Sequence, residues 1–133
     1  MADWLETTWL SLTSNQIYKE WPLGIIDGLF NQAGVFDTSP LLNLVTRLLK
    51  EKGSFKREVI VSTVDVNTGK YVQFDSKTLP FSDYPTAVVS SASIPFIFPH
   101  QNFKGYVLMD GSTAWNTNLI NAVDTCKAKG FSD

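Results

Sequence analysis

The chain has 133 residues, the length of one domain or part of one, with 44% hydrophobic residues, 18% charged residues and a formal net charge of -2. No basic stripe indicates a nucleic-acid partner, and one histidine (His100) with one cysteine (Cys126) makes neither an intrachain disulfide nor a zinc site, so no metal or cofactor is predicted. No apolar run reaches the roughly 18 residues of a spanning helix. The first residues lack the basic region of a signal peptide, which leaves the compartment undetermined, either cytoplasmic or peripheral to a membrane.

Three helices are predicted in the first half of the chain. Apolar residues at helical spacing predict a helix over residues 3–20, which a Trp-Pro pair ends because proline resists continuing a helix. A short apolar helix or turn follows over residues 23–32. The best-marked helix starts in the Asp-Thr-Ser-Pro segment at residues 37–40, which supplies capping hydroxyls and a proline suited to the first helical position, and it ends near Gly53.

Three strands are predicted in the second half. Residues 58–66 (EVIVSTVDV) are rich in β-branched side chains, and their nearly continuous apolar first half is typical of a strand buried on both faces. An Asn-Thr-Gly turn leads into a returning strand at residues 71–74. The third strand, residues 105–109 (GYVLM), runs directly into Asp110.

The remaining segments, residues 84–93 and 118–129, are predicted helices, and the resulting order of elements is typical of an α/β fold. A strand buried on both faces normally has neighbours on both sides, yet only about three strands are predicted. One central strand edge would then carry unpaired N–H and C=O groups, which is costly. We therefore expect further strands from a segment N-terminal to Met1 or from another chain.

Asp110 is the strongest candidate for a chemical role, because it stands at the carboxyl end of a strand and precedes a glycine. In open α/β sheets, ligands and catalytic groups gather at the carboxyl ends of strands. Gly111 lets the backbone turn tightly while the carboxylate stays accessible. The alternative is that Asp110 only caps the turn or the helix that follows, and local features alone favour this structural role.

The residues around Asp110 resemble the patatin-like phospholipase family at several spaced positions. That family has a Ser-Ser-Ala-x-Ile-Pro-like segment, an aromatic-Pro loop, a strand that ends in Asp-Gly, and an Asn a few residues later. The matching residues are Ser90, Ser91, Ala92, Ile94, Pro95, Phe98, Pro99, Asp110, Gly111 and Asn116. Upstream matches are Asp65, Thr68, Gly69, Phe74 and the segment at 36–41. The similarity spans roughly residues 20–125.

The resemblance implies a partial three-layer α/β/α fold that lacks the N-terminal strands, with residues 1–133 as the C-terminal portion of a single patatin-like domain. It also implies a lipid acyl hydrolase, which cleaves the acyl ester of a phospholipid or related lipid with a Ser–Asp dyad. In that dyad, Asp110 would accept the proton of the serine hydroxyl. The residues that would shape the site are Gly111, Asn116, Pro95 and Phe98.

The nucleophile of such a dyad is absent from the sequence. Family members place it in a G-x-S-x-G turn, with a Gly-rich oxyanion loop further upstream, and neither pattern occurs here. The only glycine pair at that spacing is Gly24 and Gly28, with Ile26 at its centre. The chain alone is therefore predicted to be inactive. Ser112 and Asn118 are two smaller departures from the family's pattern.

For the other residues near Asp110 we favour structural roles over catalytic ones. Ser90, Ser91 and Ser93 suggest a nucleophile cluster, but we expect packing serines whose hydroxyls bond to the backbone. His100 is expected at the rim of the site, because the dyad needs no histidine. Residues 96–98 (Phe-Ile-Phe) are expected in the core, although an exposed patch there would suit membrane-surface contact.

Three functional hypotheses stay open from the sequence. The first is part of a lipid acyl hydrolase, whose partners are a lipid acyl ester and the polypeptide segment that completes the sheet. The second is a non-catalytic patatin-like domain that acts as a binding or scaffolding subunit, which the missing nucleophile supports. The third is an unrelated small α/β module in which Asp110 is a turn acid.

Overall fold

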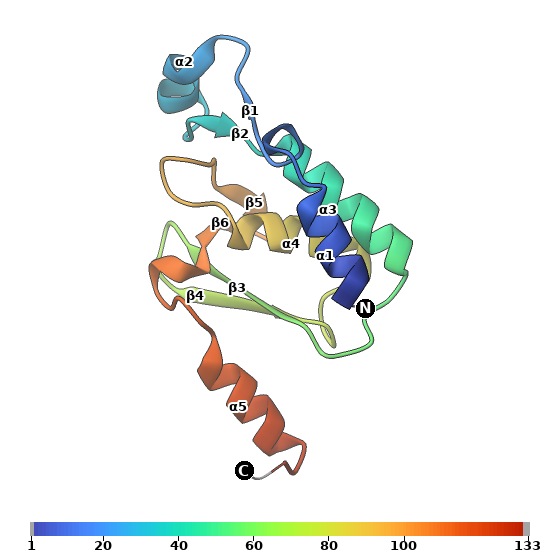
Figure 1. The fold of residues 1–133 in the computed structure, drawn as a ribbon. Helices are drawn as coiled ribbons and strands as arrows, with labels where there is room; N and C mark the ends of the chain where they lie inside the picture. Colours follow the sequence, from blue (N-terminus) through green and yellow to red (C-terminus); the bar gives the residue numbers. More distant parts are fainter. Residues whose placement is uncertain (1, 132–133) are drawn as a thin grey trace.

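The computed structural model describes residues 2–131, whose elements are shown in Figure 1. The helices are α1 (Ala2–Leu10), α2 (Gly24–Asn31), α3 (Ser39–Lys52), α4 (Tyr84–Ser91) and α5 (Leu119–Ala128). The strands are β1 (Lys19–Glu20), β2 (Phe36–Asp37), β3 (Ile60–Asp65), β4 (Tyr71–Asp75), β5 (Gln101–Phe103) and β6 (Tyr106–Asp110). The short 3-10 turns are η1 (Ser14–Gln16), η2 (Phe81–Asp83) and η3 (Gly111–Thr113). Among the residues described, no helix has the length and hydropathy that crossing a membrane requires.

The main sheet has the strand order β4-β3-β6-β5, and every neighbouring pair is antiparallel. β3 and β4 form the hairpin predicted around the Asn-Thr-Gly turn. β5 and β6 form a second hairpin, which the sequence pattern does not reveal because β5 is only three residues long. β1 and β2 form a separate two-stranded ladder. The predicted mixed α/β class is confirmed, with five helices and two small antiparallel sheets in residues 2–131.

One face of the main sheet carries the hydrophobic core. Val61 of β3 is directly opposite Phe74 of β4, and Leu108 of β6 lies on the same face because side chains alternate along each strand. These three side chains pack with Tyr84 and Ala87 of α4. α3 packs on the outer side of α4, so the helices are stacked on this face of the sheet (Figure 1).

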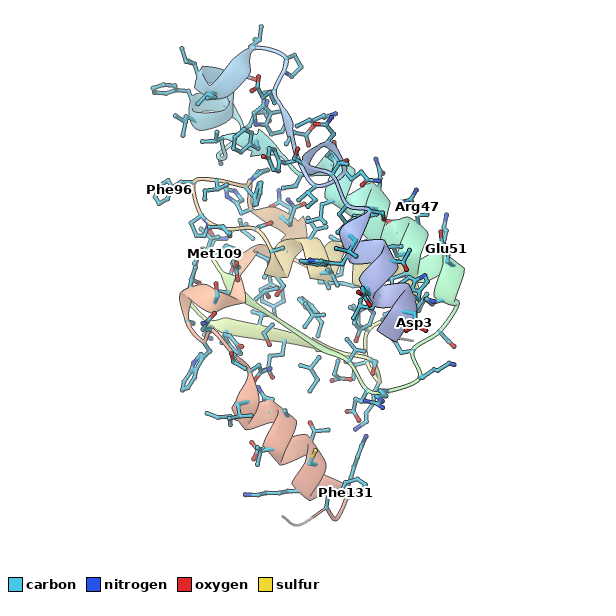
Figure 2. All side chains as sticks on the ribbon, in the orientation of Figure 1. Asp3, Arg47, Glu51, Phe96, Met109 and Phe131 are labelled. Carbon is cyan, nitrogen blue, oxygen red and sulfur yellow. The ribbon has the colours of Figure 1, made fainter. Side chains whose placement is uncertain are left out.

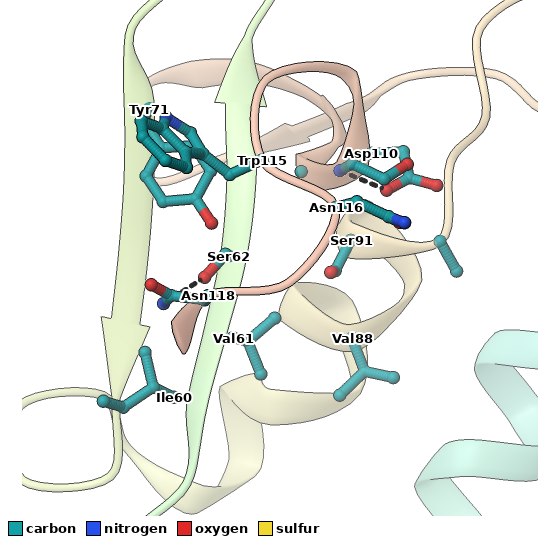
Figure 3. Close-up of a pocket in the computed structure, with 13 residues that line it drawn as sticks. Ile60, Val61, Ser62, Tyr71, Val88, Ser91, Asp110, Trp115, Asn116 and Asn118 are labelled. Carbon is teal, nitrogen blue, oxygen red and sulfur yellow. Dashed lines mark hydrogen bonds between the residues drawn. The ribbon is translucent and has the colours of Figure 1, made fainter. Parts of the chain in front are cut away.

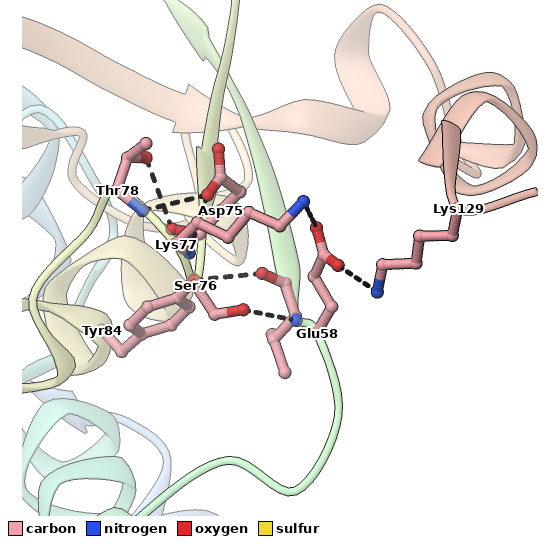
Figure 4. A network of polar contacts seen from close by, with 8 residues as sticks. Glu58, Asp75, Ser76, Lys77, Thr78, Tyr84 and Lys129 are labelled. Carbon is pink, nitrogen blue, oxygen red and sulfur yellow. Dashed lines mark hydrogen bonds and ion pairs between the residues drawn. The ribbon is translucent and has the colours of Figure 1, made fainter. Parts of the chain in front are cut away.

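The opposite face has no comparable helical layer within residues 2–131. α5 extends away from the sheet on this side and buries none of its residues (Figure 1). Its C-terminal end is tied to the segment that leads into β3, because the Glu58 carboxylate pairs with Lys129 and, at 3.0 Å, with Lys77 (Figure 4). The ammonium groups of Lys129 and Lys77 lower the pKa of Glu58. The described residues therefore form two packed layers, with α5 attached at one end.

The predicted helix over residues 3–20 is wrong beyond Leu10. α1 ends there, and the chain continues through η1 into β1. The Ser-Leu-Thr-Ser run after Leu10 explains the break, because its hydroxyl groups compete for backbone hydrogen bonds. The Ser11 hydroxyl donates to a carbonyl in the last turn of α1 (2.8 Å), and the Gln16 side chain accepts the Thr13 N–H (3.0 Å) to start η1. The other predicted helices and strands lie within two residues of their observed bounds.

α3 begins where the sequence predicts, with Thr38 at the N-cap position, but the side chain that binds its first residue is that of Asp37 and not a capping hydroxyl group. The Asp37 carboxylate accepts hydrogen bonds from the backbone N–H of Ser39 (2.7 Å) and from its hydroxyl (3.0 Å). It also pairs with Lys19 of β1 at 3.2 Å. Burial alone would raise the pKa of Asp37, but these partners outweigh burial and the pKa is lowered. The same carboxylate therefore starts α3 and fastens β1 to β2.

β3 is paired on both sides only in its C-terminal half. β4 lies along the strand, whereas β6 pairs only with residues 63–65. In an antiparallel sheet, alternate residues direct their N–H and C=O groups to opposite neighbours. The N–H of Val66 donates to a carbonyl of β6 (2.7 Å), so by alternation Ile60 and Ser62 direct their backbone groups to the same side. Ser62 there stands opposite Gly111, whereas Ile60 lies beyond the end of β6. Within residues 2–131, β6 therefore covers only the C-terminal half of β3, and whether a further strand pairs beyond it stays a prediction.

Candidate catalytic site

Asp110 ends β6 and begins η3, and backbone hydrogen bonds fix it on both sides. Its N–H donates to the Ser93 carbonyl after α4 (2.9 Å), and its own carbonyl accepts from the Thr113 hydroxyl (2.8 Å). The carboxylate oxygen Oδ1 accepts the Ser112 N–H at 2.8 Å and so caps η3, which confirms that Asp110 has a structural role in the turn. Within residues 2–131 no hydrogen bond occupies Oδ2, so one oxygen stays available to another group.

Gly111 brings this turn into contact with β3. The residue is buried, and a Cβ atom placed on it would overlap the carbonyl group of Ser62. Any larger side chain would push η3 away from the sheet and displace the Asp110 carboxylate with it. The glycine after the acid is therefore required by the close approach of two backbones.

Asp110 lies in an open cleft of about 470 Å³ beside the unpaired half of β3 (Figure 3). The walls come from β3, from the end of α4 and from residues 110–118. Three predicted site residues line this cleft: Asp110, Gly111 and Asn116. The other two, Pro95 and Phe98, line a separate groove of about 290 Å³ together with Ser93. The hydrogen bond between Asp110 and Ser93 connects this cleft to the mainly apolar groove.

The cleft is also lined by residues that were not predicted as site residues, among them Ser62, Tyr71, Trp115 and Asn118. The Asn118 amide donates to the Ser62 hydroxyl at 2.7 Å and joins the segment before α5 to β3 (Figure 3). The Tyr71 hydroxyl is buried and has no partner among the residues described, which costs about 1–3 kcal/mol. Only Ser62 left a sequence signal, as a polar residue within a run of β-branched ones.

The three serines near Asp110 divide into two groups. Ser90 and Ser93 each donate their hydroxyl to a backbone carbonyl of α4 at 2.8 Å, as expected for packing serines. Ser91 instead lines the cleft near Asp110 (Figure 3). Among residues 2–131, no serine hydroxyl is hydrogen-bonded to the Asp110 carboxylate, whose one side-chain bond comes from a backbone N–H.

A second acid, Asp65, positions the strand that carries Asp110. Its carboxylate accepts the Thr68 hydroxyl (2.6 Å) and the Val107 N–H of β6 (3.2 Å). The hydrogen bond from Thr68, helped by those from the backbone, outweighs burial and lowers the pKa of Asp65. The acid and the Thr-Gly turn near it therefore have a structural explanation: they hold the turn after β3 and the register of β6.

The segment at residues 96–98 differs from the expectation of core packing. Phe96 is 81% exposed and Ile97 is 42% exposed, while Phe98 is half-buried with its ring 6.3 Å from that of Tyr18. Phe96 is held in a left-handed backbone conformation (φ 68°), and its carbonyl accepts a hydrogen bond from the segment that follows α2. His100 is exposed and lies at the rim of the apolar groove.

The chemistry that the cleft offers is proton acceptance by a carboxylate, with hydroxyl and amide groups close by. Within the described part of the chain, no group of three or more His, Cys, Asp or Glu side chains is placed to hold a metal ion. A carboxylate can serve as a general base when the hydroxyl it activates comes within about 2.6–3.2 Å. Oδ2 of Asp110 is the oxygen that such a hydroxyl could reach.

Comparison with known protein families gives one match. A family model described as Patatin-like phospholipase covers residues 1–123, which includes Asp110, Asn116 and both walls of the cleft. No curated protein matches the chain.

Proposed function

The chain belongs to the patatin-like phospholipase family, and from that premise we propose that Asp110 is the proton acceptor of a Ser–Asp dyad in a lipid acyl hydrolase. The observation that carries this proposal is the position of its carboxylate. Oδ1 is held by the Ser112 N–H, while Oδ2 has no partner within residues 2–131 and lies in an open cleft. A base oriented in this way is preorganised to accept a proton from a hydroxyl that enters the cleft.

The nucleophilic serine is proposed to come from a polypeptide segment other than residues 1–133, either N-terminal to Met1 or in another chain. The N-terminal part of β3 supports this, since the backbone groups of Ile60 face the cleft side beyond the end of β6 and have no strand partner there in residues 2–131. An extended segment could pair there by strand addition. Residues 1–133 would then be the C-terminal portion of one three-layer domain, completed by strands that this chain lacks.

The proposed reaction has two steps with the same base. The serine oxygen attacks the acyl carbonyl as its proton passes to Asp110 Oδ2, and Asp110 then gives that proton to the departing oxygen, so that the alcohol leaves and an acyl-enzyme remains. Water attacks the acyl-enzyme as one of its protons passes to Asp110, and Asp110 returns this proton to the serine oxygen as the fatty acid leaves. The Ser112 N–H keeps the carboxylate oriented in both steps, and Gly111 keeps the turn that bears it against β3. The chain alone is proposed to be inactive, because it supplies the base without the nucleophile.

The test is Asp110→Asn in the parent protein, assayed for hydrolysis of a phospholipid ester. Asparagine keeps the cap on η3 but cannot accept the proton, so turnover should fall by roughly 10²–10⁴-fold while the circular dichroism spectrum is unchanged. Asp124→Asn, which alters an exposed acid of α5, is the matched control and should keep full turnover. Turnover of Asp110→Asn within tenfold of the wild type would remove Asp110 from this role.

A fluorophosphonate, which labels activated serines covalently, locates the nucleophile. We expect the label on a serine outside residues 1–133. A label on Ser91, the serine of α4 that lines the cleft, would place the nucleophile in this chain and contradict the proposal. If the parent protein takes no label and hydrolyses no ester, the family fold serves instead as a non-catalytic binding or scaffolding subunit.

A further inference from the structure

α2 packs against the rest of the molecule through a glycine. Gly28 is the one buried residue of this helix, and a Cβ on it would lie 2.5 Å from the Gly34 carbonyl oxygen and 2.7 Å from Trp21 Cδ1. The Trp21 indole N–H donates to the same Gly34 carbonyl at 3.0 Å, which fixes the chain before α2 to the chain after it. The contact is thus between backbones and one indole, and no large apolar side chain of α2 takes part in it.

The apolar side chains of α2 point outward as a result. Leu23, Ile25, Ile26, Leu29 and Phe30 are 78%, 50%, 73%, 51% and 83% exposed. A helix on a globular protein normally turns such a stripe toward the core. Here the arrangement is reversed, and α2 exposes several large apolar side chains. The helix lies at the end of the molecule farthest from α5 (Figure 1).

Phe96 is fixed beside this helix by backbone hydrogen bonds. The Val35 N–H donates to the Phe96 carbonyl and the Phe36 N–H to the Ile97 carbonyl, both at 3.0 Å. Phe96 and Ala33 both have positive φ angles (68° and 56°), a conformation that costs a non-glycine residue of order 1–3 kcal/mol. Figure 2 shows the Phe96 ring projecting outward from its loop. We call the exposed side chains of residues 23–30 together with Phe96 the α2 surface.

The α2 surface carries no positive charge. No Lys or Arg occurs between residues 20 and 46 or between residues 93 and 103. The acids in these segments are Glu20, Asp27, which accepts the Asn31 amide at 2.8 Å, and Asp37, which is paired with Lys19. An anionic membrane is recognised by clusters of Lys and Arg, and the α2 surface has none, so its charge pattern does not fit an anionic lipid surface.

The α2 surface is continuous with the groove beside the proposed site. Leu29 and Phe96 belong to the surface and also line the groove of about 290 Å³, which extends to Ser93 and Met109. Ser93 accepts the Asp110 N–H, and Met109 precedes Asp110 in β6 (Figure 2 places Met109 on the sheet side of the Phe96 loop). An acyl chain that enters between Leu29 and Phe96 would therefore approach the segment that bears the base.

We propose that the α2 surface docks the protein onto a zwitterionic lipid interface, and that the adjoining groove admits one acyl chain from it. The partner is a phosphatidylcholine-like surface, because hydrophobic insertion of Ile26, Phe30 and Phe96 drives binding without help from basic residues. This proposal rests on the proposed function for the use of the groove, but docking itself is measured without any turnover.

The test is sedimentation of the protein with phosphatidylcholine vesicles. The double variant Ile26→Gln/Phe30→Gln should lower the vesicle partition coefficient by about tenfold or more, since each exposed apolar side chain contributes to insertion. Trp9→Gln/Leu10→Gln removes two apolar side chains of similar exposure (71% and 77%) from α1 and is the matched control, with binding expected within twofold of the wild type. Replacing part of the phosphatidylcholine by phosphatidylserine, or raising the salt concentration, should not strengthen or abolish binding.

Three results would overturn the proposal: equal loss in both double variants, binding that requires phosphatidylserine, or a self-association that the α2 double variant abolishes while vesicles are never bound. The last result would assign the surface to a second copy of the chain. Asp110→Asn separates the two proposals, because it should bind vesicles as the wild type does. If it binds normally and also hydrolyses normally, the proposed base is wrong and the docking surface stands.

Discussion

α2 and α4 are both eight residues long, and they differ most in what they bury. The buried residues of α4 are Tyr84, Pro85, Ala87, Val89 and Ser90, whereas α2 buries only Gly28. The difference runs against composition, because α2 has four large aliphatic or aromatic side chains and α4 has two valines and a tyrosine. Contact with the sheet, and not the apolar content of the helix, decides which of the two belongs to the core.

The two helices therefore have different roles: α4 stabilises the fold and positions Asp110, whereas α2 presents an exposed surface. α4 lies on β3, β5 and β6, and the chain that leaves it bonds the Asp110 N–H through Ser93, so its packing determines where the carboxylate stands. α2 is joined to the molecule mainly by a glycine contact and a Trp21 hydrogen bond. A change in α4 should therefore be felt as a loss of stability, and a change on the outer side of α2 as a loss of binding.

The largest effect is expected for Tyr84→Ala in α4. Tyr84 is 1% exposed, its ring packs edge-on 4.6 Å from that of Phe55, and its hydroxyl donates to the Val59 carbonyl at 3.0 Å. Removing this side chain leaves a cavity and an unpaired carbonyl, so the free energy of unfolding should fall by about 3–5 kcal/mol in urea denaturation. Phe30→Ala in α2, which removes an even more apolar ring, should change it by no more than about 0.5 kcal/mol.

This pair of variants tests directly whether α4 belongs to the core and α2 does not. If Phe30→Ala destabilises the protein nearly as much as Tyr84→Ala does, then α2 is part of the folded core, and its outward side chains are covered in solution. Tyr84→Phe refines the measurement, since it keeps the ring and removes only the hydrogen bond. Its cost should be about 1 kcal/mol.

A smaller effect is expected for Gly28→Ala, which acts on the inner side of α2. Alanine favours a helix by about 1 kcal/mol relative to glycine, but the added methyl group would lie within 3 Å of the Gly34 and Val35 carbonyl oxygens and of the Trp21 ring. We expect a net loss of about 1–3 kcal/mol, as for other overpacked contacts, and weaker vesicle binding because α2 shifts. A gain in stability by urea denaturation would show that α2 is not held by this contact.

The sequence predicts α4 and α2 equally well as helices but not which of them is buried. Helix bounds follow from local signals such as Pro85 and the apolar spacing, and these lie in the chain itself. Burial depends on the sheet, which is assembled from strands far apart in sequence. The expectation that residues 96–98 lie in the core failed for this reason, since backbone bonds from Val35 hold Phe96 outside.

The candidate site was predictable where its residues are local and hidden where they are not. Asp110, Gly111 and Asn116 follow one strand, so one segment of sequence brings them into the same cleft. Ser62 and Tyr71 come from a different hairpin, and only the register of β3 with β4 and β6 places them there. The prediction of a helix over residues 3–20 was wrong beyond Leu10 for a local reason. It followed the apolar spacing and gave too little weight to the hydroxyl residues after Leu10, which end α1.

The smallest effect is expected for Glu58→Gln, which extends the comparison to α5. α5 buries none of its residues, and its C-terminal end is held by the pair between Lys129 and Glu58, which Lys77 shares (Figure 4). The variant should change the free energy of unfolding only slightly, because ion pairs with solvent-exposed lysines contribute little. It should nevertheless lower the hydrogen-exchange protection of α5, and Asp124→Asn, an exposed acid on the same helix, should not.

The pH dependence gives this last prediction its sign. Lys129 and Lys77 lower the pKa of Glu58 from its ordinary value of 4.5, so the carboxylate is charged in the folded protein at any pH above that value. The tether is therefore complete at neutral pH and is lost as the pH falls through and below about 4.5 toward the lowered pKa. In the wild type, protection of α5 should drop over this range, whereas in Glu58→Gln it should already be low and stay constant. Protection that falls equally in both proteins would show that another contact, and not Glu58, attaches α5 to the sheet.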